Sequence, residues 1–163
     1  MGRRNVQSGM GVPPFQDFLE AHREDVYRFL VAVVGREEAE DCFQETFLSA
    51  LRAYPRLRFD SDLRAWIMTI AHRKSMDAFR SRRRRPNPIG VLPEMAVDPV
   101  NPPEPELWKA VRALPTGQRA AVTLRFLADL PFREVGRILR CSEPAARQRV
   151  REGLKTLREV WPG

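Results

Sequence analysis

The stretch that decides the fold is LPTGQRAAVTLRFLADLPFREVGRILRCSEPAARQRVREGLKTLR, residues 114–158. A helix capped by Thr116 is expected to run to about Ala128, and a short helix from Pro131 to Leu139 follows it, since proline is tolerated at the first helical position. Three residues later Ser142 is a good N-cap for a last helix, about 143–160. A short helix, a tight turn and a basic helix predict a helix-turn-helix.

The N-terminal half is also predicted to be helical, because its apolar residues recur every three to four positions. The first predicted helix follows Pro13 and Pro14 and ends at Gly35, and a second runs from about Glu37 to Tyr54, with Phe43, Phe47 and Leu51 on its apolar face. A third begins after Asp60 or Ser61 and continues into the arginine run. No segment alternates like a strand, so the fold class is all-α.

Proline marks the domain boundary. Seven prolines lie between positions 86 and 105, and no helix crosses such a stretch. The organisation predicted is a disordered leader over 1–12, a helical domain over 13–85, a Pro-rich acidic linker over 86–105, and a helix-turn-helix domain over 106–163.

The net charge of the chain indicates which classes of partner it can bind. The 163 residues carry 28 Lys and Arg against 21 Asp and Glu, a net charge of +7 that attracts polyanions, so nucleic acid or an anionic membrane surface comes first. The sequence has no secretory signal, no membrane-spanning run and no zinc spacing, and Cys42 and Cys141 fit small core residues. A cytoplasmic protein without cofactor or metal is expected.

The last predicted helix is basic. Its cations alternate with acids, which suits insertion into a major groove with arginines on phosphates: Arg147, Arg149, Arg151, Lys155 and Arg158. An ordinary solvated amphipathic helix is the alternative.

A second basic element runs from Arg73 to Arg85, with seven cations and the single acid Asp77. Basic charge beside the aromatic residues Phe59 and Trp66 suits unpaired bases, which stack while their phosphates are neutralised. The alternatives are a polybasic tail or a membrane-surface anchor, and a core position for most of the Trp66 ring.

An acidic stripe lies on the second predicted helix. Asp41, Gln44, Glu45 and Leu48 are spaced i, i+3, i+4, i+7 on a face away from Phe43 and Phe47. This stripe is either a protein-docking face or simply a solvated surface.

The sequences of these elements resemble those of a known protein family. AEDCFQETFLSALRAY (39–54) followed by LRAWIMTIAHRKSMDAFRSRRRR (63–85) resembles region 2 of extracytoplasmic-function (ECF) sigma factors, and residues 114–158 resemble region 4. The strings D-x-x-Q-E-T-F and R-A-W-x-x-x-I-A are specific at this spacing. The resemblance covers nearly the whole chain outside the leader and the linker.

The resemblance implies a non-enzymatic transcription initiation factor. It would bind core RNA polymerase, through the β′ clamp and the β subunit, with Asp41, Gln44, Glu45 and Leu48, and promoter DNA through two sets of residues. The set for the −10 element is Phe59, Asp60, Ser61, Arg73, Lys74, Asp77, Arg80 and Arg84, and the set for the −35 element is Arg119, Ser142, Pro144, Ala145, Arg147, Gln148, Arg149, Arg151 and Lys155. An anti-sigma factor is the expected regulator, and neither a small-molecule substrate nor membrane insertion is expected.

The chain departs from the family pattern at several of these positions. Many members carry Asn where Arg73 stands and Gly where Arg140 stands. The Gly-Thr pair that enters the recognition helix is Pro144-Ala145 here, and Glu152 would sit near phosphate. The family's −35 specificity therefore does not carry over.

The competing function is a stand-alone helix-turn-helix regulator without polymerase docking, which the acidic stripe and the long basic helix disfavour. A nuclease would need clustered carboxylates or histidines, and here the acids are dispersed and the two histidines are isolated. A membrane-surface role rests on the arginine run alone.

Overall fold

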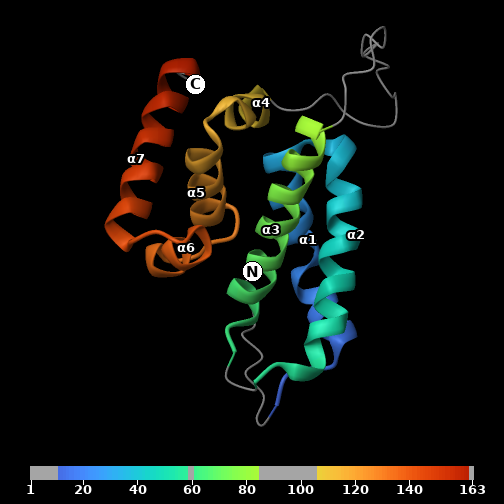
Figure 1. Ribbon diagram of the computed structural model, residues 1–163. Helices are drawn as coiled ribbons and strands as arrows, with labels where there is room; N and C mark the ends of the chain where they lie inside the picture. Colours follow the sequence, from blue (N-terminus) through green and yellow to red (C-terminus); the bar gives the residue numbers. More distant parts are fainter. Residues whose placement is uncertain (1–10, 59–60, 85–105, 162–163) are drawn as a thin grey trace, which may run out of the picture.

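The computed structural model describes residues 11–58, 61–84 and 106–161 of the chain, with the side chains of residues 83 and 84 left aside. These residues form seven α-helices and one short 3-10 helix, and no strand occurs among them (Figure 1). The all-α prediction is confirmed. The predicted leader and Pro-rich linker fall almost entirely outside the described residues, so those domain boundaries stay predictions.

The first three helices form an up-down-up bundle (Figure 1). They are α1 (Phe15–Val34), α2 (Arg36–Ala53) and α3 (Leu63–Arg84), with the 3-10 turn η1 (Tyr54–Arg56) after α2. The buried aromatic ring of Phe18 packs against those of Tyr54 and Trp66, with ring centroids 5.2 and 5.6 Å away. Trp66 is half-buried, and its ring packs against Phe18 and Tyr54 of the core, which agrees with the predicted core position for most of the ring.

The helix ends in this half follow local chemistry. Gly35 closes α1 with φ 86°, a left-handed region that suits glycine, and α2 starts at the next residue. The cap of α3 is neither Asp60 nor Ser61 but Asp62, whose Oδ1 accepts a hydrogen bond from the Ala65 amide at 3.1 Å. That difference of one residue arises because three acceptor side chains, 60–62, stand in a row before α3.

The second half contains α4 (Glu106–Ala113), α5 (Thr116–Phe126), α6 (Phe132–Leu139) and α7 (Glu143–Val160). Ser142 caps α7 as predicted, with its hydroxyl accepting from the Ala145 amide at 3.2 Å. Thr116 does not cap α5: Pro115 holds the N-cap position and Thr116 is already helical. A proline there leaves the cap without a side-chain acceptor.

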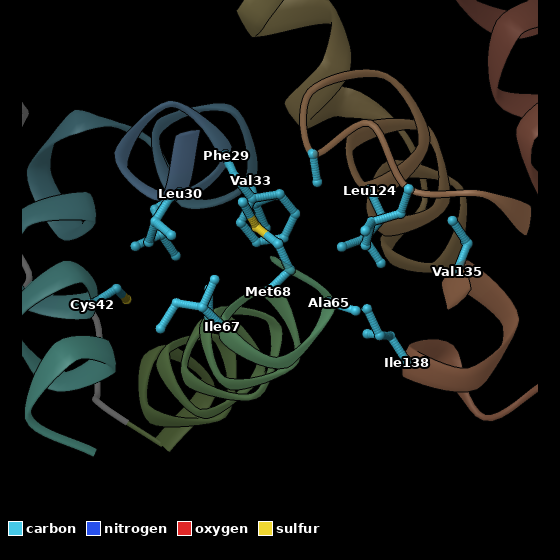
Figure 2. Close-up of a cluster of buried hydrophobic side chains, with 14 of the residues drawn as sticks. Phe29, Leu30, Val33, Cys42, Ala65, Ile67, Met68, Leu124, Val135 and Ile138 are labelled. Carbon is cyan, nitrogen blue, oxygen red and sulfur yellow. The ribbon is translucent and has the colours of Figure 1, made fainter. Parts of the chain in front are cut away.

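The two halves share one hydrophobic cluster. Figure 2 shows Phe29 and Val33 of α1 and Met68 of α3 turned toward Leu124 of α5, with Ala65 of α3 next to Ile138 of α6. All but Ile138, which is 8% exposed, are at most 6% exposed. The helix-turn-helix half therefore packs directly on the three-helix bundle, on the side away from α2 (Figure 1).

Candidate docking and nucleic-acid surfaces

The acidic stripe of α2 lies open to solvent. Asp41, Gln44, Glu45 and Leu48 are all exposed and share the helix face opposite the buried Cys42, Thr46 and Ala50. Leu48 is 53% exposed, unusual for an aliphatic side chain in the middle of a helix. Carboxylates beside an exposed leucine form a surface suited to a protein partner with basic and apolar groups.

Leu51 extends this surface, although the spacing of apolar residues along the sequence had predicted it on the apolar face of the helix, with Phe43 and Phe47. It follows Leu48 by three residues and Gln44 by seven, and it is 49% exposed. Its position lies at the border between the two faces of α2, so the apolar period alone could not assign it. The α2 stripe, as the term is used below, consists of Asp41, Gln44, Glu45, Leu48 and Leu51.

The thiol of Cys42 lies on the buried side of α2. Burial, and then the nearby carboxylates of Glu38 and Glu45, raises the pKa of Cys42 to about 11. The thiol therefore stays protonated at neutral pH, which agrees with the predicted core role. Cys141 is half-buried in the turn before α7.

The basic face of α3 combines residues from the predicted −10 set. Arg73, Asp77 and Arg80 are exposed at helical spacing, and Asp77 and Arg80 lie 3.7 Å apart as an ion pair. Lys74 lies about 100° around the helix from Arg73 and is half-buried. Its backbone carbonyl lies 4.0 Å from the Cys42 sulfur. Arg84 continues the Arg73 face by helical register, and its side chain is outside the described part.

The loop before α3 is described only at its borders. Phe59 and Asp60 of the predicted −10 set lie outside the described residues. Ser61 is half-buried, and its amide donates to the Arg58 carbonyl at 3.1 Å.

The turn between α6 and α7 takes a left-handed residue. Arg140, where the family commonly has glycine, adopts φ 57° and ψ 43°. The next amide, of Cys141, donates to the Gly136 carbonyl at 2.9 Å and closes the end of α6. The turn keeps its shape without glycine, so the departure at Arg140 leaves the helix-turn-helix intact.

The outer face of α7 carries most of the predicted −35 set. Pro144, Arg147, Gln148, Arg151 and Lys155 are exposed at the spacing i, i+3, i+4, i+7 and i+11, which places them on one helix face, and Arg158 extends the same face. Arg147 is held in place on two sides, by Glu143 at 2.7 Å and by the Phe132 ring 4.7 Å from its guanidinium carbon. This surface, called the α7 face below, offers four cations at the outer edge of the molecule (Figure 1).

Four residues of that set lie elsewhere: Arg119, Ser142, Ala145 and Arg149. A Cβ at Gly117 would come within 3.9 Å of Arg149 Cδ, so Arg149 lies along α5 rather than on the α7 face. The amide of Ala145 serves the Ser142 cap. Arg119, at the start of α5, turns inward and donates to the Val33 carbonyl of α1 at 3.0 Å.

Glu152 joins a polar network on α7. Its carboxylate accepts hydrogen bonds from Gln148 at 2.9 Å and from Gln118 of α5 at 3.4 Å. Arg151 in turn donates to the Gln148 amide oxygen at 3.2 Å. The Gln148 amide is thereby oriented from both sides, which the sequence did not reveal because Gln118 comes from another helix.

The described residues include no group of three or more His, Cys, Asp or Glu side chains placed to hold a metal ion. None of the helices in the described part is long and apolar enough to cross a membrane.

Comparison with known proteins matches both halves of the chain. The family described as Sigma-70 region 2 matches residues 18–85, and the family described as Sigma-70, region 4 matches residues 105–157. Several curated relatives are 32% identical, and two of them serve as examples. One is the ECF RNA polymerase sigma factor SigC of Mycobacterium tuberculosis, over 139 residues that cover 82% of this chain and 75% of SigC. The other is the RNA polymerase sigma factor CarQ of Myxococcus xanthus, over 156 residues that cover 90% of this chain and 88% of CarQ.

Two solved structures share the fold of the whole chain. The sigma factor RpoE of Bartonella quintana, in complex with the anti-sigma factor NepR, has a TM-score of 0.73 at 21% identity and covers 90% of this chain and 95% of RpoE. CnrH, in complex with the cytosolic domain of CnrY, has a TM-score of 0.67 at 18% identity and covers 90% of this chain and 86% of CnrH.

Proposed function

Because the chain belongs to the ECF RNA polymerase sigma factors, which serve transcription initiation, we propose that it binds core polymerase through the α2 stripe and directs it to promoters with two elements. The basic face of α3 and the loop before it read the −10 element, and the α7 face reads the −35 element. The observation that carries the proposal is the placement of these surfaces. One acidic-apolar and two basic faces are exposed on different helices of one chain.

The two basic faces suit different forms of DNA. On the α7 face, Arg147 and Arg151 lie in the N-terminal half of a helix that follows a tight turn, the geometry of major-groove reading, and Lys155 continues the same face toward the C-terminus. On α3, Arg73 and Arg80 stand on a long helix behind an aromatic-containing loop, which suits an opened strand. Arg73 has donors only, so a base edge rich in acceptors, such as that of guanine, suits it best.

An anti-sigma factor is the proposed regulator. RpoE is in complex with an anti-sigma factor in one of the solved structures that share the fold, and RpoE spans 90% of this chain.

The test of polymerase docking is the double variant Asp41→Ala/Glu45→Ala. Both carboxylates are exposed, so the fold should survive while affinity for core polymerase falls roughly tenfold or more, since tenfold corresponds to 1.4 kcal/mol. Competition binding to purified core polymerase measures the loss.

The matched control is Glu20→Ala/Glu24→Ala, which removes two exposed acids from α1 and changes the net charge equally. It should bind like the wild type. Equal affinities for the two double variants would reject the α2 stripe as the docking face, and a wild-type chain that does not bind core polymerase at all would favour the stand-alone regulator.

A further inference from the structure

The side-chain amide of Gln148, on the α7 face, contacts a charged group at each of its two ends. Its Nε2 donates to Glu152 Oε1 at 2.9 Å, and its Oε1 accepts from Arg151 Nη1 at 3.2 Å. A carboxylate can only accept and a guanidinium can only donate, so these partners fix which end of the amide is nitrogen and which is oxygen. An amide without such partners can rotate and exchange the two ends. Gln148 is therefore held in one orientation.

The Glu152 carboxylate is positioned in turn by Gln118 of α5. Gln118 Nε2 donates to Glu152 Oε2 at 3.4 Å, while the other carboxylate oxygen accepts from Gln148. The two helices approach closely at Gly153 of α7, where a Cβ would lie 2.7 Å from Val122 Cγ2 and 3.5 Å from Gln118 Cβ. This close crossing of α5 and α7 brings Gln118 within reach of Glu152.

An acidic residue beside a surface that binds DNA needs a physical reason. Glu152 is exposed and lies next to the cations of the α7 face, where its negative charge repels phosphates and lowers the affinity for DNA of any sequence. Its carboxylate meets the amides of Gln148 and Gln118. Hydrogen bonds to charged groups are stronger than those between neutral groups, so the carboxylate orients Gln148 better than a neutral acceptor would. Such an arrangement can serve base selection rather than general affinity.

The hydrogen-bonding groups that remain on the Gln148 amide match one base. A glutamine amide has two N–H groups and two oxygen lone pairs, and Glu152 and Arg151 occupy one of each. One donor and one acceptor are left. In the major groove, adenine presents an acceptor at N7 and a donor at N6, which a glutamine amide meets with two hydrogen bonds. Guanine presents two acceptors there, so it can use only one of the two groups.

We propose that Gln148 reads an adenine in the −35 element, and that Glu152 and Gln118 are positioning residues that fix the orientation of its amide. This role rests on the proposed function, in which the α7 face enters the major groove of duplex DNA, and it adds to that function a base and the residues that select it. Arg151 has further N–H groups besides the one that Gln148 accepts, and these stay available to phosphates.

The test is base selection by the full-length protein bound to core polymerase, on a DNA library randomised over both promoter elements, with sequencing of the retained DNA. The wild type should prefer adenine roughly tenfold at one position of the −35 element, and Gln148→Ala should lose that preference and keep the others. Glu152→Gln keeps the size of the side chain but can offer Gln148 either a donor or an acceptor. The adenine preference should then fall roughly threefold or more, while affinity for all sequences rises because a negative charge is removed.

Glu159→Gln is the matched control, because it removes an exposed acid from the same helix and changes the charge equally. It should raise affinity and leave every base preference unchanged. Gln118→Ala alters neither α7 nor the net charge, so it should weaken the adenine preference without a general change in affinity.

Two results would overturn the inference. If Glu152→Gln behaved like Glu159→Gln, Glu152 would act through its charge alone and would have no positioning role. If Gln148→Ala kept the adenine preference, or if the preference it lost were for another base, Gln148 would not read adenine. In either case base selection at other positions would leave the proposed function standing, whereas a wild type without any selection in the −35 element would reject that function and this role together.

Discussion

Gly136 of α6 has no room for a side chain. A Cβ there would lie 2.8 Å from the Cys141 carbonyl oxygen, in the backbone of the turn before α7. Gly136→Ala should lower the free energy of unfolding by up to about 2 kcal/mol, since overpacking costs about 1–3 kcal/mol and the better helix propensity of alanine returns about 1 kcal/mol. Urea unfolding measures the change.

Gly117→Ala is the control, because a Cβ there would meet its nearest atoms only at 3.9 Å. That variant should be neutral or slightly stabilised. If Gly136→Ala were as stable as Gly117→Ala, the turn before α7 would have to be looser than the structure describes.

His72 makes the stability of the fold depend on pH. Burial, and then the charge of Arg73, lowers the pKa of His72 from 6.5 to about 4, and its Nδ1 finds no partner among the described residues. As pH falls, the unfolded chain takes up this proton first, so the stability that neutral His72 supports above pH 6.5 is lost between pH 6.5 and about 4. The expected loss is roughly 2 kcal/mol between about pH 7 and pH 5.

Urea unfolding at these two pH values, on the wild type and on His72→Gln, checks this. The variant should lose less stability on acidification. Some dependence should remain, because burial also lowers the pKa of His22. A pH dependence of the same size in both proteins would mean that His72 titrates normally in the folded chain.

Several single residues show which structural features could be predicted from the local sequence alone. Ser142 was predicted to cap α7 and does so, because a cap depends on its own helix only. Arg140 takes the left-handed conformation that the turn needs. Thr116, by contrast, follows a proline that already holds the cap position, and Leu51 lies between two helix faces, so both predictions were wrong.

Among the helices, α7 allows a quantitative prediction of how DNA binding depends on salt concentration. Its face presents Arg147, Arg151, Lys155 and Arg158 to solvent. If these four reach phosphates, the slope of log K against log salt concentration for duplex binding should be roughly −3 to −4, at about 0.9 per neutralised phosphate. Fluorescence anisotropy over a salt series measures it.

Replacing Arg151 and Lys155 together with alanine should bring that slope closer to zero by roughly two units. Arg149→Ala is a matched control on the same helix, because Arg149 lies along α5 and should change the slope little. A wild-type slope near zero would contradict the proposal that α7 binds DNA.

Helical register explains how much of the candidate site could be predicted at this scale. Spacing alone placed together the members of the α2 stripe other than Leu51, and likewise Arg73, Asp77 and Arg80 of α3, and the structure has them exposed at that register. The inward turn of Arg119 and the Gln118–Glu152 hydrogen bond involve separate helices. No pattern along one helix contains that information.

At the scale of the whole molecule, the all-α class and the helix-turn-helix were predictable, and the joining of the halves was not. Proline positions predicted two helical domains and left their relative placement open, and in the structure Met68, Leu124 and their neighbours form one continuous apolar cluster (Figure 2). The reason is that apolar residues at an interface between domains have the same period as residues of a domain core.

The central claim is that this chain gives core polymerase its choice of promoter. The direct test is transcription by purified core polymerase with and without the protein, on a DNA library randomised over both promoter elements, with sequencing of the transcribed templates. The account predicts initiation that depends on the protein and selects bases at two clusters about 25 base pairs apart, at roughly 1–3 kcal/mol for each well-read base. Equal output with and without the protein, or output without base selection, would contradict it.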